Sequence, residues 1–324
     1  MSAKQRILER LEQCRGQSVS GAALAEELGV SRTAVWKAVQ SLQKDGYLID
    51  AVRNKGYLLR KENDKLSLEG IKPYLDDPDM IGRIAIYDTL ASTNLTAKKL
   101  ALDGAPSGTA VLANTQTQGR GRLGRSFYSP PDAGLYFSQI LRPSIPAEDS
   151  VLITTAASVA VCRAIESVTG LYPLIKWVND IYLDGKKICG ILTEAVTNIE
   201  SGEIASVVIG IGINVSAAAF PPELSAVAGA LYQTRPAAVS RNRLAAGLFN
   251  QLQHLPEMVQ SRSYLPEYRQ RSLVLGKRIR ILGQAEQLAD VLDIDSDGGL
   301  VVRLLADGRR AVLKSGEISI RLTE

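Results

Sequence analysis

Residues 20–43 decide the fold of the N-terminal part of the chain. They read Ser20-Gly-Ala-Ala-Leu-Ala-Glu-Glu-Leu-Gly-Val-Ser-Arg-Thr-Ala-Val-Trp-Lys-Ala-Val-Gln-Ser-Leu-Gln43. Apolar residues recur at helical spacing in two runs, which predict helices over 22–28 and 32–43. The residues expected to be buried are Leu24, Leu28, Val35, Val39 and Leu42. Ser20 and Ser31 stand at the N-cap positions, and Gly29 supplies a sharp turn. Two short helices joined by a glycine turn indicate a helix-turn-helix.

The segments on either side extend this unit to a winged helix-turn-helix. A first helix is predicted over 2–14, and two strand-like runs, 47–49 and 57–59, flank the basic tip Arg53-Asn-Lys-Gly56 of a predicted hairpin. The polar stretch 60–65 is predicted to be a linker. Residues 1–62 hold eleven Lys and Arg against seven Asp and Glu, so the net charge of +4 belongs to this segment.

This basic module has the features of a DNA-binding domain. A recognition helix enters the major groove with its N-terminal residues at the base edges, while a wing meets phosphates. The expected DNA contacts are therefore Ser31, Arg32, Thr33, Ala34, Trp36, Lys37 and Gln40 in the second helix of the pair, and Arg53 and Lys55 in the wing. A three-helix module for protein contacts is the alternative. The coincidence of helix spacing, basic surplus and wing favours DNA.

Composition limits the remaining possibilities. A chain of 324 residues predicts two or three domains. No uncharged apolar run reaches the roughly 18 residues that a membrane span needs, so a cytoplasmic protein without membrane contact is expected. Cys14, Cys162 and Cys189 are odd in number and far apart, which argues against a disulfide framework and against a zinc site. The single histidine, His254, lies in a predicted helix end, so chemistry should rely on Arg, Lys, Asp and backbone amides.

The rest of the chain predicts two further units. Residues 64–271 mix helical patterns at 95–102 and 151–168 with strand-like runs at 84–87, 135–141, 181–183 and 207–215, which indicates an α+β domain. From 272 onward only short alternating strands follow, with turns at 297–299 and 307–308, which predicts a small β-barrel. The expected fold class is α+β multidomain: a winged helix-turn-helix over 1–63, a mixed α/β domain over 64–271, and a small SH3-like β-barrel over 272–324.

The most unusual segment is Gln116-Thr-Gln-Gly-Arg-Gly-Arg-Leu-Gly-Arg125, in which residues 119–125 are called the arginine loop below. Such a loop can bring backbone N–H groups and guanidinium forks onto phosphate or carboxylate oxygens. Its three glycines also fit G-x-G-x-x-G. However, no helix pattern follows, and no acidic residue lies about 20 positions on, so a dinucleotide-binding fold is excluded. A flexible surface linker is the other interpretation of this segment.

Five stretches carry a resemblance to a known family. They are Ser92-Thr-Asn94, Gln116 with Gly119–Arg125, Lys176-Trp-Val-Asn-Asp180, Lys187-Ile-Cys-Gly-Ile-Leu192 and Gly210-Ile-Gly-Ile-Asn214. In their order and spacing the chain resembles the bifunctional biotin operon repressors that are also biotin protein ligases. The resemblance implies a ligase that uses ATP, Mg²⁺ and biotin to form biotinyl-5′-AMP and biotinylates the carrier protein of acetyl-CoA carboxylase. It also implies a repressor of biotin genes, with the adenylate as corepressor, operator DNA as a partner and a ligand-promoted homodimer.

The same resemblance implies which residues form the site. The residues expected to bind biotin or its adenylate are Ser92, Thr93, Asn94, Gln116, Gly119, Arg120, Gly121, Arg122, Gly124, Arg125, Lys187, Gly190 and Asn214. Arg120, Arg122 and Lys187 are also expected to be catalytic, because the reaction needs two anions to be held together. From the chemistry of the transfer step, Asp180 is the candidate for assisting or orienting the attacking carrier lysine, and no protein-bound metal site is expected. Two departures stand out: Leu123 replaces an arginine found in many members, and Val178 replaces a common proline.

Each motif also has a purely structural interpretation. The segment 92–94 could cap the following helix, and 176–180 could be a strand and turn. Gly210 and Gly212 would weaken a strand unless something approaches the backbone closely. Two other functions remain open from the residues: a lipoyl-type acyl ligase, and a ligand-sensing transcription regulator without ligase activity.

Overall fold

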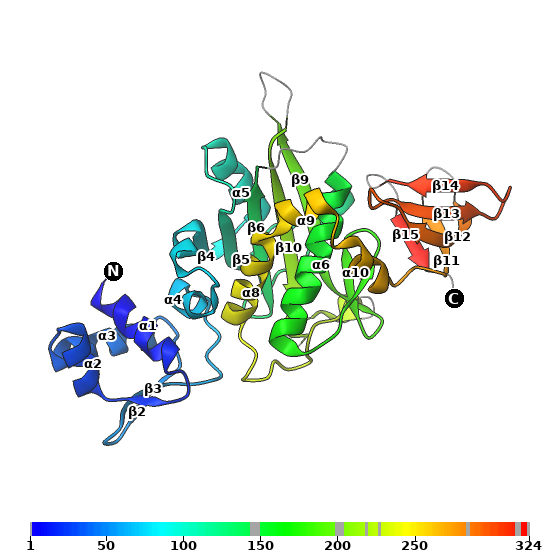
Figure 1. Cartoon of the computed structure of the whole chain (residues 1–324). Coiled ribbons are helices and arrows are strands. Elements are labelled where there is room, and N and C mark those ends of the chain that lie inside the picture. Colours follow the sequence, from blue (N-terminus) through cyan, green and yellow to red (C-terminus); the bar gives the residue numbers. More distant parts are fainter. Residues whose placement is uncertain are drawn as a thin grey trace.

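The computed structural model describes residues 2–142, 150–197, 204–217, 220–225, 228–282, 286–314 and 319–322. These residues form sheets of three, seven and five strands. Figure 1 shows the N-terminal helices and the smallest sheet at one end, the seven-stranded sheet in the middle and the five-stranded sheet at the other end.

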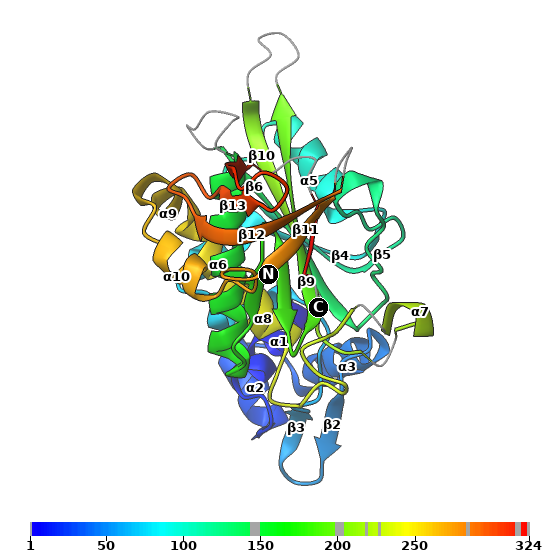
Figure 2. The same ribbon diagram turned by 90° about the vertical axis from the view of Figure 1, so that its right-hand side faces the viewer.

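The N-terminal unit is the predicted winged helix-turn-helix. Its elements are α1 (Ala3–Gln13), β1 (Ser18–Val19), α2 (Gly21–Leu28), α3 (Arg32–Lys44), β2 (Ile49–Val52) and β3 (Gly56–Leu59). The predicted caps are confirmed, because the hydroxyls of Ser20 and Ser31 accept backbone N–H groups of the helices that follow, and Gly29 ends α2 with a left-handed φ of 63°. The five residues predicted to be buried all contribute to a separate hydrophobic core. In Figure 2 the β2–β3 wing projects from the lower end of the molecule.

The central unit is a mixed sheet with the order β4-β5-β6-β10-β9-β8-β7. Its strands are β4 (Ile84–Leu90), β5 (Ala110–Gln116), β6 (Gly134–Leu141), β7 (Leu174–Lys176), β8 (Asp180–Leu183), β9 (Lys186–Thr197) and β10 (Ile204–Asn214). The β4–β5 pair is parallel and the other neighbours are antiparallel. The helices are α4 (Leu68–Ile71), α5 (Thr93–Leu102), α6 (Ser150–Thr169), α7 (Pro222–Ser225), α8 (Arg241–Gln253), α9 (Leu255–Ser261) and α10 (Leu265–Gln270). Short 3-10 turns lie at η1 (Lys72–Tyr74), η2 (Pro78–Arg83) and η3 (Arg122–Gly124).

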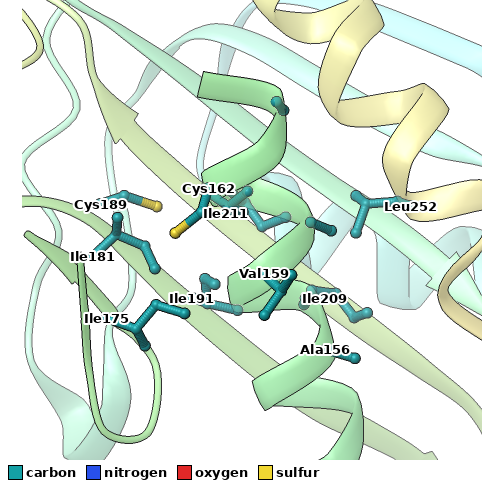
Figure 3. Close-up of a cluster of buried hydrophobic side chains, with 14 of the residues drawn as sticks. Ala156, Val159, Cys162, Ile175, Ile181, Cys189, Ile191, Ile209, Ile211 and Leu252 are labelled. Atoms are coloured by element: carbon teal, nitrogen blue, oxygen red, sulfur yellow. The ribbon is translucent and has the colours of Figure 1, made fainter. Parts of the chain in front are cut away.

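Helices cover both faces of this sheet. On one face α5 packs Ala97 and Ala101 against Val111, Ile140 and Val208. On the other face α6 runs across the sheet, and Figure 3 shows its side chains among isoleucines of β7 to β10. By length and composition helix α6 could cross a membrane, but 78% of its most apolar stretch is buried inside the molecule. It is the central core helix of this domain.

The three cysteines are free, and two of them belong to this core. Cys162 on α6 and Cys189 on β9 are fully buried. Burial raises the pKa of the Cys162 thiol to about 12 and moves the pKa of Cys189 in the same direction. Both thiols therefore stay protonated at neutral pH and act as packing residues. His254 is exposed at the junction of α8 and α9, which confirms the predicted helix end.

The C-terminal unit is an antiparallel sheet with the order β14-β13-β12-β11-β15. Its strands are β11 (Arg278–Leu282), β12 (Gln287–Ile294), β13 (Leu300–Leu304), β14 (Arg310–Leu313) and β15 (Ser319–Leu322). The predicted turns at 297–299 and 307–308 join β12 to β13 and β13 to β14. The sheet shares one continuous hydrophobic core with the central unit. The indole N–H of Trp177 also donates a hydrogen bond of 3.0 Å to the carbonyl of Gly298.

The polar stretch 60–65 joins the first two units, as predicted, but it is held on both sides. The side-chain oxygen of buried Asn63 accepts the N–H of Leu48, and Asp64 pairs with Arg241 at 2.8 Å. Its polar side chains are therefore bound by partners distant in the sequence, which composition alone does not reveal. A linker of this kind is a fixed connection between the units.

Candidate functional site

A cavity of about 240 Å³ lies where the N-terminus of α5, the arginine loop, the β7–β8 turn and the middle of β9 and β10 meet. Eleven of the residues predicted from the motifs contribute to its lining. They are Ser92, Thr93, Asn94, Gln116, Arg120, Gly121, Arg122, Arg125, Asp180, Lys187 and Gly190. Residues as far apart in the sequence as Ser92 and Leu282, which are separated by 190 positions, therefore converge on one site.

Three predicted residues lie outside the lining. A Cβ on Gly119 would lie 2.3 Å from the carbonyl oxygen of Phe127, so this glycine allows the arginine loop to fold back on itself. Gly124 has a left-handed φ of 72°, which a side chain would disfavour. Asn214 is buried and donates to the carbonyl of Gly229 at 2.9 Å. These residues act on the local backbone conformation and do not line the cavity.

Several residues that line the cavity were not predicted. Phe127 covers the two central strands, and Trp177 and Asn179 belong to the β7–β8 turn, in which the Trp177–Val178 peptide bond is cis. The full additional set is Leu123, Ser126, Phe127, Lys176, Trp177, Asn179, Ile191, Leu192, Gly210, Ile211, Gly212 and Leu282. Most of them lie inside or beside the quoted motifs, so their position next to predicted site residues was the sequence feature that could have identified them. Leu282 comes from the C-terminal sheet and carries no such signal.

One side of the cavity is a chain of uncharged hydrogen-bonding groups. Gln116 uses its side-chain oxygen to accept from the N–H of Thr93 at 2.8 Å and from the Thr93 hydroxyl at 3.1 Å. Its amide nitrogen donates to the Ser129 hydroxyl at 2.9 Å. Ser92 occupies the N-cap position of α5 but makes no side-chain capping bond, so the interpretation of the segment 92–94 as a helix cap is not confirmed. The segment connects α5 to β5 at the cavity through the bonds between Thr93 and Gln116.

Asn94 is fixed in orientation by the groups around it. Its amide nitrogen donates to the Glu194 carboxylate at 2.8 Å, and Glu194 also pairs with Lys98 at 2.5 Å. The Ser138 hydroxyl lies 2.6 Å from the side-chain oxygen of Asn94 and 2.7 Å from that of Thr93. Since Glu194 can only accept when ionised, the Asn94 oxygen must point to Ser138.

Two glycines of β10 allow side chains to approach the strand closely, as predicted. A Cβ on Gly210 would lie 2.0 Å from the side-chain oxygen of Asn94, and a Cβ on Gly212 would lie 2.6 Å from the Phe127 ring. Any larger residue would displace these groups from the cavity.

The other side of the cavity is strongly basic. Arg120, Arg122, Arg125, Lys176 and Lys187 all line it, and among the described lining residues Asp180 is the one carboxylate. Such an excess of positive charge suits a polyphosphate.

Two of these cations are held in place by partners on β8 and in the turn before it. Lys187 pairs with Asp180 at 2.6 Å, and Arg122 donates to the side-chain oxygen of Asn179 at 3.1 Å. Burial lowers the pKa of the Arg122 guanidinium, with Arg125 acting in the same direction and Asp180 opposing it. The guanidinium remains charged at neutral pH. Within the described ranges no group of three His, Cys, Asp or Glu residues could hold a metal ion.

A second candidate surface lies on the N-terminal unit. Arg32, Thr33, Trp36, Lys37 and Gln40 are exposed on α3, and the wing residues 53–55 are exposed at its tip. Ala34 is partly buried, and the Ser31 hydroxyl caps α3 by accepting from the Ala34 N–H. Over the described part of the chain no ion pair is formed by Arg32, Lys37, Arg53 or Lys55. Trp36 is 52% exposed, which is high for a tryptophan.

The chain is similar in sequence and in structure to known proteins. Residues 87–214 match the Biotin/lipoate A/B protein ligase family, and residues 4–58 match an HTH domain. The chain is 43% identical over 237 residues to the bifunctional ligase/repressor BirA of Bacillus subtilis (strain 168), covering 72% of each. It is 29% identical over 316 residues to BirA of Escherichia coli (strain K12), covering 95% of each. It is also similar to the solved biotin protein ligase from Aquifex aeolicus in complex with biotin and ATP, with a TM-score of 0.63, 26% identity and coverage of 74% of this chain and 99% of that one.

Fold and site together define a class of protein in which a winged helix-turn-helix is joined to a biotin/lipoate-type ligase domain. The class combines a DNA-binding surface with a cavity that has a neutral and a basic side. The chain belongs to the bifunctional ligase/repressor BirA family.

Proposed function

We propose that this protein is an ATP-dependent biotin–[acetyl-CoA-carboxylase] ligase and a repressor of biotin genes. It forms biotinyl-5′-AMP, transfers biotin to a lysine of the biotin carboxyl carrier protein, and binds operator DNA with the adenylate as corepressor. The observation that carries the proposal is the two-sided cavity, in which neutral hydrogen-bonding groups of α5 and β5 face a cluster of five cations. A neutral ureido ring suits the first side, and phosphates suit the second.

Activation of biotin requires little acid–base chemistry. One carboxylate oxygen attacks the α-phosphate of ATP, a mixed anhydride forms, and pyrophosphate leaves with the bonding electrons. The carboxylate is already ionised at neutral pH, so no general base is needed. Arg120, Arg122 and Lys187 hold the two anions together and stabilise the charge that develops. No histidine stands among the described residues that line the cavity, which is consistent with this chemistry.

Mg²⁺ accompanies the triphosphate in this proposal. Mg²⁺ is usually held by one or two carboxylates together with substrate phosphates and water, rather than by an all-protein cage. Asp180 fits that role, because its Oδ1 pairs with Lys187 and, among the described residues, no ion pair engages its Oδ2. When bound, the ion would neutralise charge on the phosphates.

Transfer of biotin needs the adenylate to be kept from water. The carrier lysine attacks the carbonyl carbon, AMP leaves with the bonding electrons, and the attacking nitrogen loses a proton. Asp180 is proposed to orient that amine, and the arginine loop is proposed to exclude water by ordering over the intermediate. Lys187 beside Asp180 keeps the carboxylate in place.

The remaining assignments complete the proposal. The domains are 1–63, 64–271 and 272–324. The separate N-terminal core supports the first boundary, and the continuous core beyond it means that the third unit works as part of the second. The C-terminal sheet is proposed to be an SH3-like barrel, supported by its five short antiparallel strands. The protein is proposed to be cytoplasmic and to form a ligand-promoted homodimer on DNA. The proposed DNA contacts are Ser31, Arg32, Thr33, Ala34, Trp36, Lys37, Gln40, Arg53 and Lys55.

Pyrophosphate release tests this function directly. With biotin and ATP present the protein should release pyrophosphate and hold biotinyl-5′-AMP through gel filtration. Arg122→Ala should speed loss of the adenylate roughly 10- to 100-fold, because one hydrogen bond to a charged group is removed. Arg303→Ala, on the exposed face of β13 and outside the cavity lining, is the matched control.

Each alternative function predicts a different outcome. Pyrophosphate release with lipoate but without biotin would indicate a lipoyl-type ligase. Binding of biotin without pyrophosphate release would indicate a sensor. An Arg122→Ala protein that holds the adenylate as long as wild type would contradict the role given to the arginine loop.

A further inference from the structure

Arg241 is a fully buried charge that lies outside the cavity. It is the first residue of α8, it is 1% exposed, and it is the largest fully buried side chain described. A buried guanidinium is tolerated only if its N–H groups and its charge are matched. All five of its N–H groups have acceptors, and these acceptors come from two segments with different tasks.

The first group of contacts binds the linker. The Arg241 Nε donates to Asp64 Oδ2 at 2.8 Å, and Nη2 donates to the Asp64 carbonyl at 2.8 Å. The backbone N–H of Arg241 donates to Asp64 Oδ1 at 2.7 Å. Asp64 therefore uses both carboxylate oxygens and its carbonyl on this one residue. Arg235 adds a further ion pair to Asp64 at 3.1 Å.

The second group of contacts binds the base of the arginine loop. Nη1 donates to Asn114 Oδ1 at 2.7 Å and to the Gly134 carbonyl at 3.3 Å, and Nη2 donates to Asp132 Oδ1 at 2.9 Å. Asn114 lies on β5, before the arginine loop, whereas Asp132 and Gly134 follow it. Asn114 Oδ1 also accepts the N–H of Asp132 at 3.3 Å. One guanidinium thus holds both ends of the segment 114–134.

The bond between Gln116 and Ser129 lies inside this clamp, two residues in from Asn114 and three in from Asp132. Further inward, the arginine loop follows Gln116 and Phe127 precedes Ser129. The N–H of Phe127 donates to the Gly119 carbonyl at 2.9 Å. The spacing of the two ends therefore sets where the arginine loop leaves the sheet. A substitution at Arg241 would therefore shift the arginine loop, although Arg241 does not line the cavity.

We propose that Arg241 is a positioning residue for the arginine loop and that Asp64, on the linker to the DNA-binding unit, stabilises that position. The inference rests on the proposed function, in which the arginine loop retains biotinyl-5′-AMP. Its consequence is that retention of the adenylate depends on a linker residue outside the cavity. Without the Asp64 carboxylate, the buried guanidinium has too little negative charge beside it, and its contacts to Asn114 and Asp132 loosen.

The test uses two conservative variants of the full chain. Asp64→Asn removes the charge on the linker side, and Asp132→Asn removes it on the loop side. Asp132 is 75% exposed and has a left-handed φ of 59°, which asparagine also tolerates, so the second variant keeps the fold. Two readouts are measured with biotin and ATP present: the rate of adenylate loss, and the rate of tryptic cleavage after residues 120, 122 and 125.

Both variants should lose the adenylate roughly tenfold faster, which corresponds to one weakened charge-assisted hydrogen bond. Tryptic cleavage within the loop should accelerate by a similar factor. Because the two carboxylates share Arg241, the double variant should depart from the product of the single effects, whereas independent sites would multiply. Asp290→Asn, which removes the partner of exposed Arg278 on the C-terminal sheet, should change neither rate.

The outcomes separate this inference from the proposed function. Wild-type rates in Asp132→Asn or in Asp64→Asn, with faster adenylate loss in Arg122→Ala, would overturn the role of Arg241 and leave the arginine loop in place. Wild-type retention in all three variants would remove the proposed role of the loop itself. Simple multiplication in the double variant would show that Asp64 and Asp132 do not act through one residue.

Discussion

The side-chain amide of Asn94 has two ends that differ in hydrogen-bonding chemistry, and its surroundings decide which end the cavity meets. The Glu194 carboxylate accepts from the nitrogen, and Ser138 lies at the oxygen. A reversed amide would bring an oxygen against a carboxylate. Glu194 therefore fixes the direction of the hydrogen bonds along this wall, although it does not line the cavity.

Glu194→Gln should weaken biotin binding selectively. A glutamine can turn either end of its amide toward Asn94 and no longer attracts Lys98, so the order of the wall is lost. We expect the KM for biotin to rise roughly tenfold, while the KM for ATP stays near wild type. Steady-state pyrophosphate release measures both constants.

Lys98→Met is the matched control for this prediction. The Lys98–Glu194 pair is partly exposed, and such pairs contribute about 0–1 kcal/mol, so the KM for biotin should change less than about fivefold. Equal increases in the KM for biotin and for ATP in Glu194→Gln would indicate a general disturbance and contradict the role of Glu194.

Sequence motifs predicted Asn94, Gln116 and every basic residue of the cavity except Lys176, but not the residues that orient them. Ser129, Ser138 and Glu194 lie in ordinary strand or loop contexts, and only the pairing of distant strands brings them to the site. The close approach at Gly210 and Gly212 was predictable, because a glycine inside a strand needs such a reason.

At the scale of elements, local signals were sufficient for the N-terminal unit. Ser20 and Ser31 cap their helices, and the wing forms around residues 53–55. The arginine loop was harder. Its sequence predicts a phosphate-binding loop, but which glycines face the cavity depends on the way 119–127 folds back. The prediction therefore included Gly119 and Gly124, which lie outside the lining.

The wing and the recognition helix should contribute to DNA binding in different ways. Lys55→Ala should weaken binding to all DNA sequences and lower the slope of log K against log salt by about one, because one phosphate contact is lost. Arg32→Ala should cost roughly 1–3 kcal/mol on the preferred sequence and much less on random DNA. Titrations at four salt concentrations measure both effects.

Lys44→Ala, at the far end of α3, is the control for these variants. A salt slope that stays at the wild-type value in Lys55→Ala, together with equal losses on all sequences in Arg32→Ala, would remove the distinction between wing and helix. If the wild-type protein bound no DNA at any of the four salt concentrations, the surface would instead be assigned to a protein partner.

At the scale of the whole molecule, contacts between units decide how the parts work together. Asp64 and Arg241 are 177 positions apart, and Trp177 meets Gly298 across 121 positions. Such pairs cannot be inferred from periodicity, since nothing in the sequence around either member of a pair indicates its distant partner. The sequence therefore predicted three units and a linker, but not that the linker is bound to the central domain or that Leu282 reaches the cavity.

One helix-turn-helix with a small basic surplus should bind DNA weakly. A two-fold dimer reads two half-sites and gains effective concentration, so dimerisation is expected to control repression. For the adenylate to act as the signal it must bind the dimer-competent state more tightly than the other state. Coupling of this kind is typically about 1–3 kcal/mol, or roughly 5- to 150-fold in affinity.

The most direct test of a joined ligase and repressor is the DNA affinity of the full chain under changing ligand conditions. A DNA fragment selected for binding to this protein is titrated without ligand, with biotin alone, with biotin and ATP, and finally with carrier protein added. Biotin with ATP should raise affinity within the range given above, and sedimentation should show self-association in parallel. Added carrier protein should reverse both, because it consumes the adenylate. Unchanged affinity and unchanged self-association across all four conditions would contradict the account, because the two activities would then only share a chain.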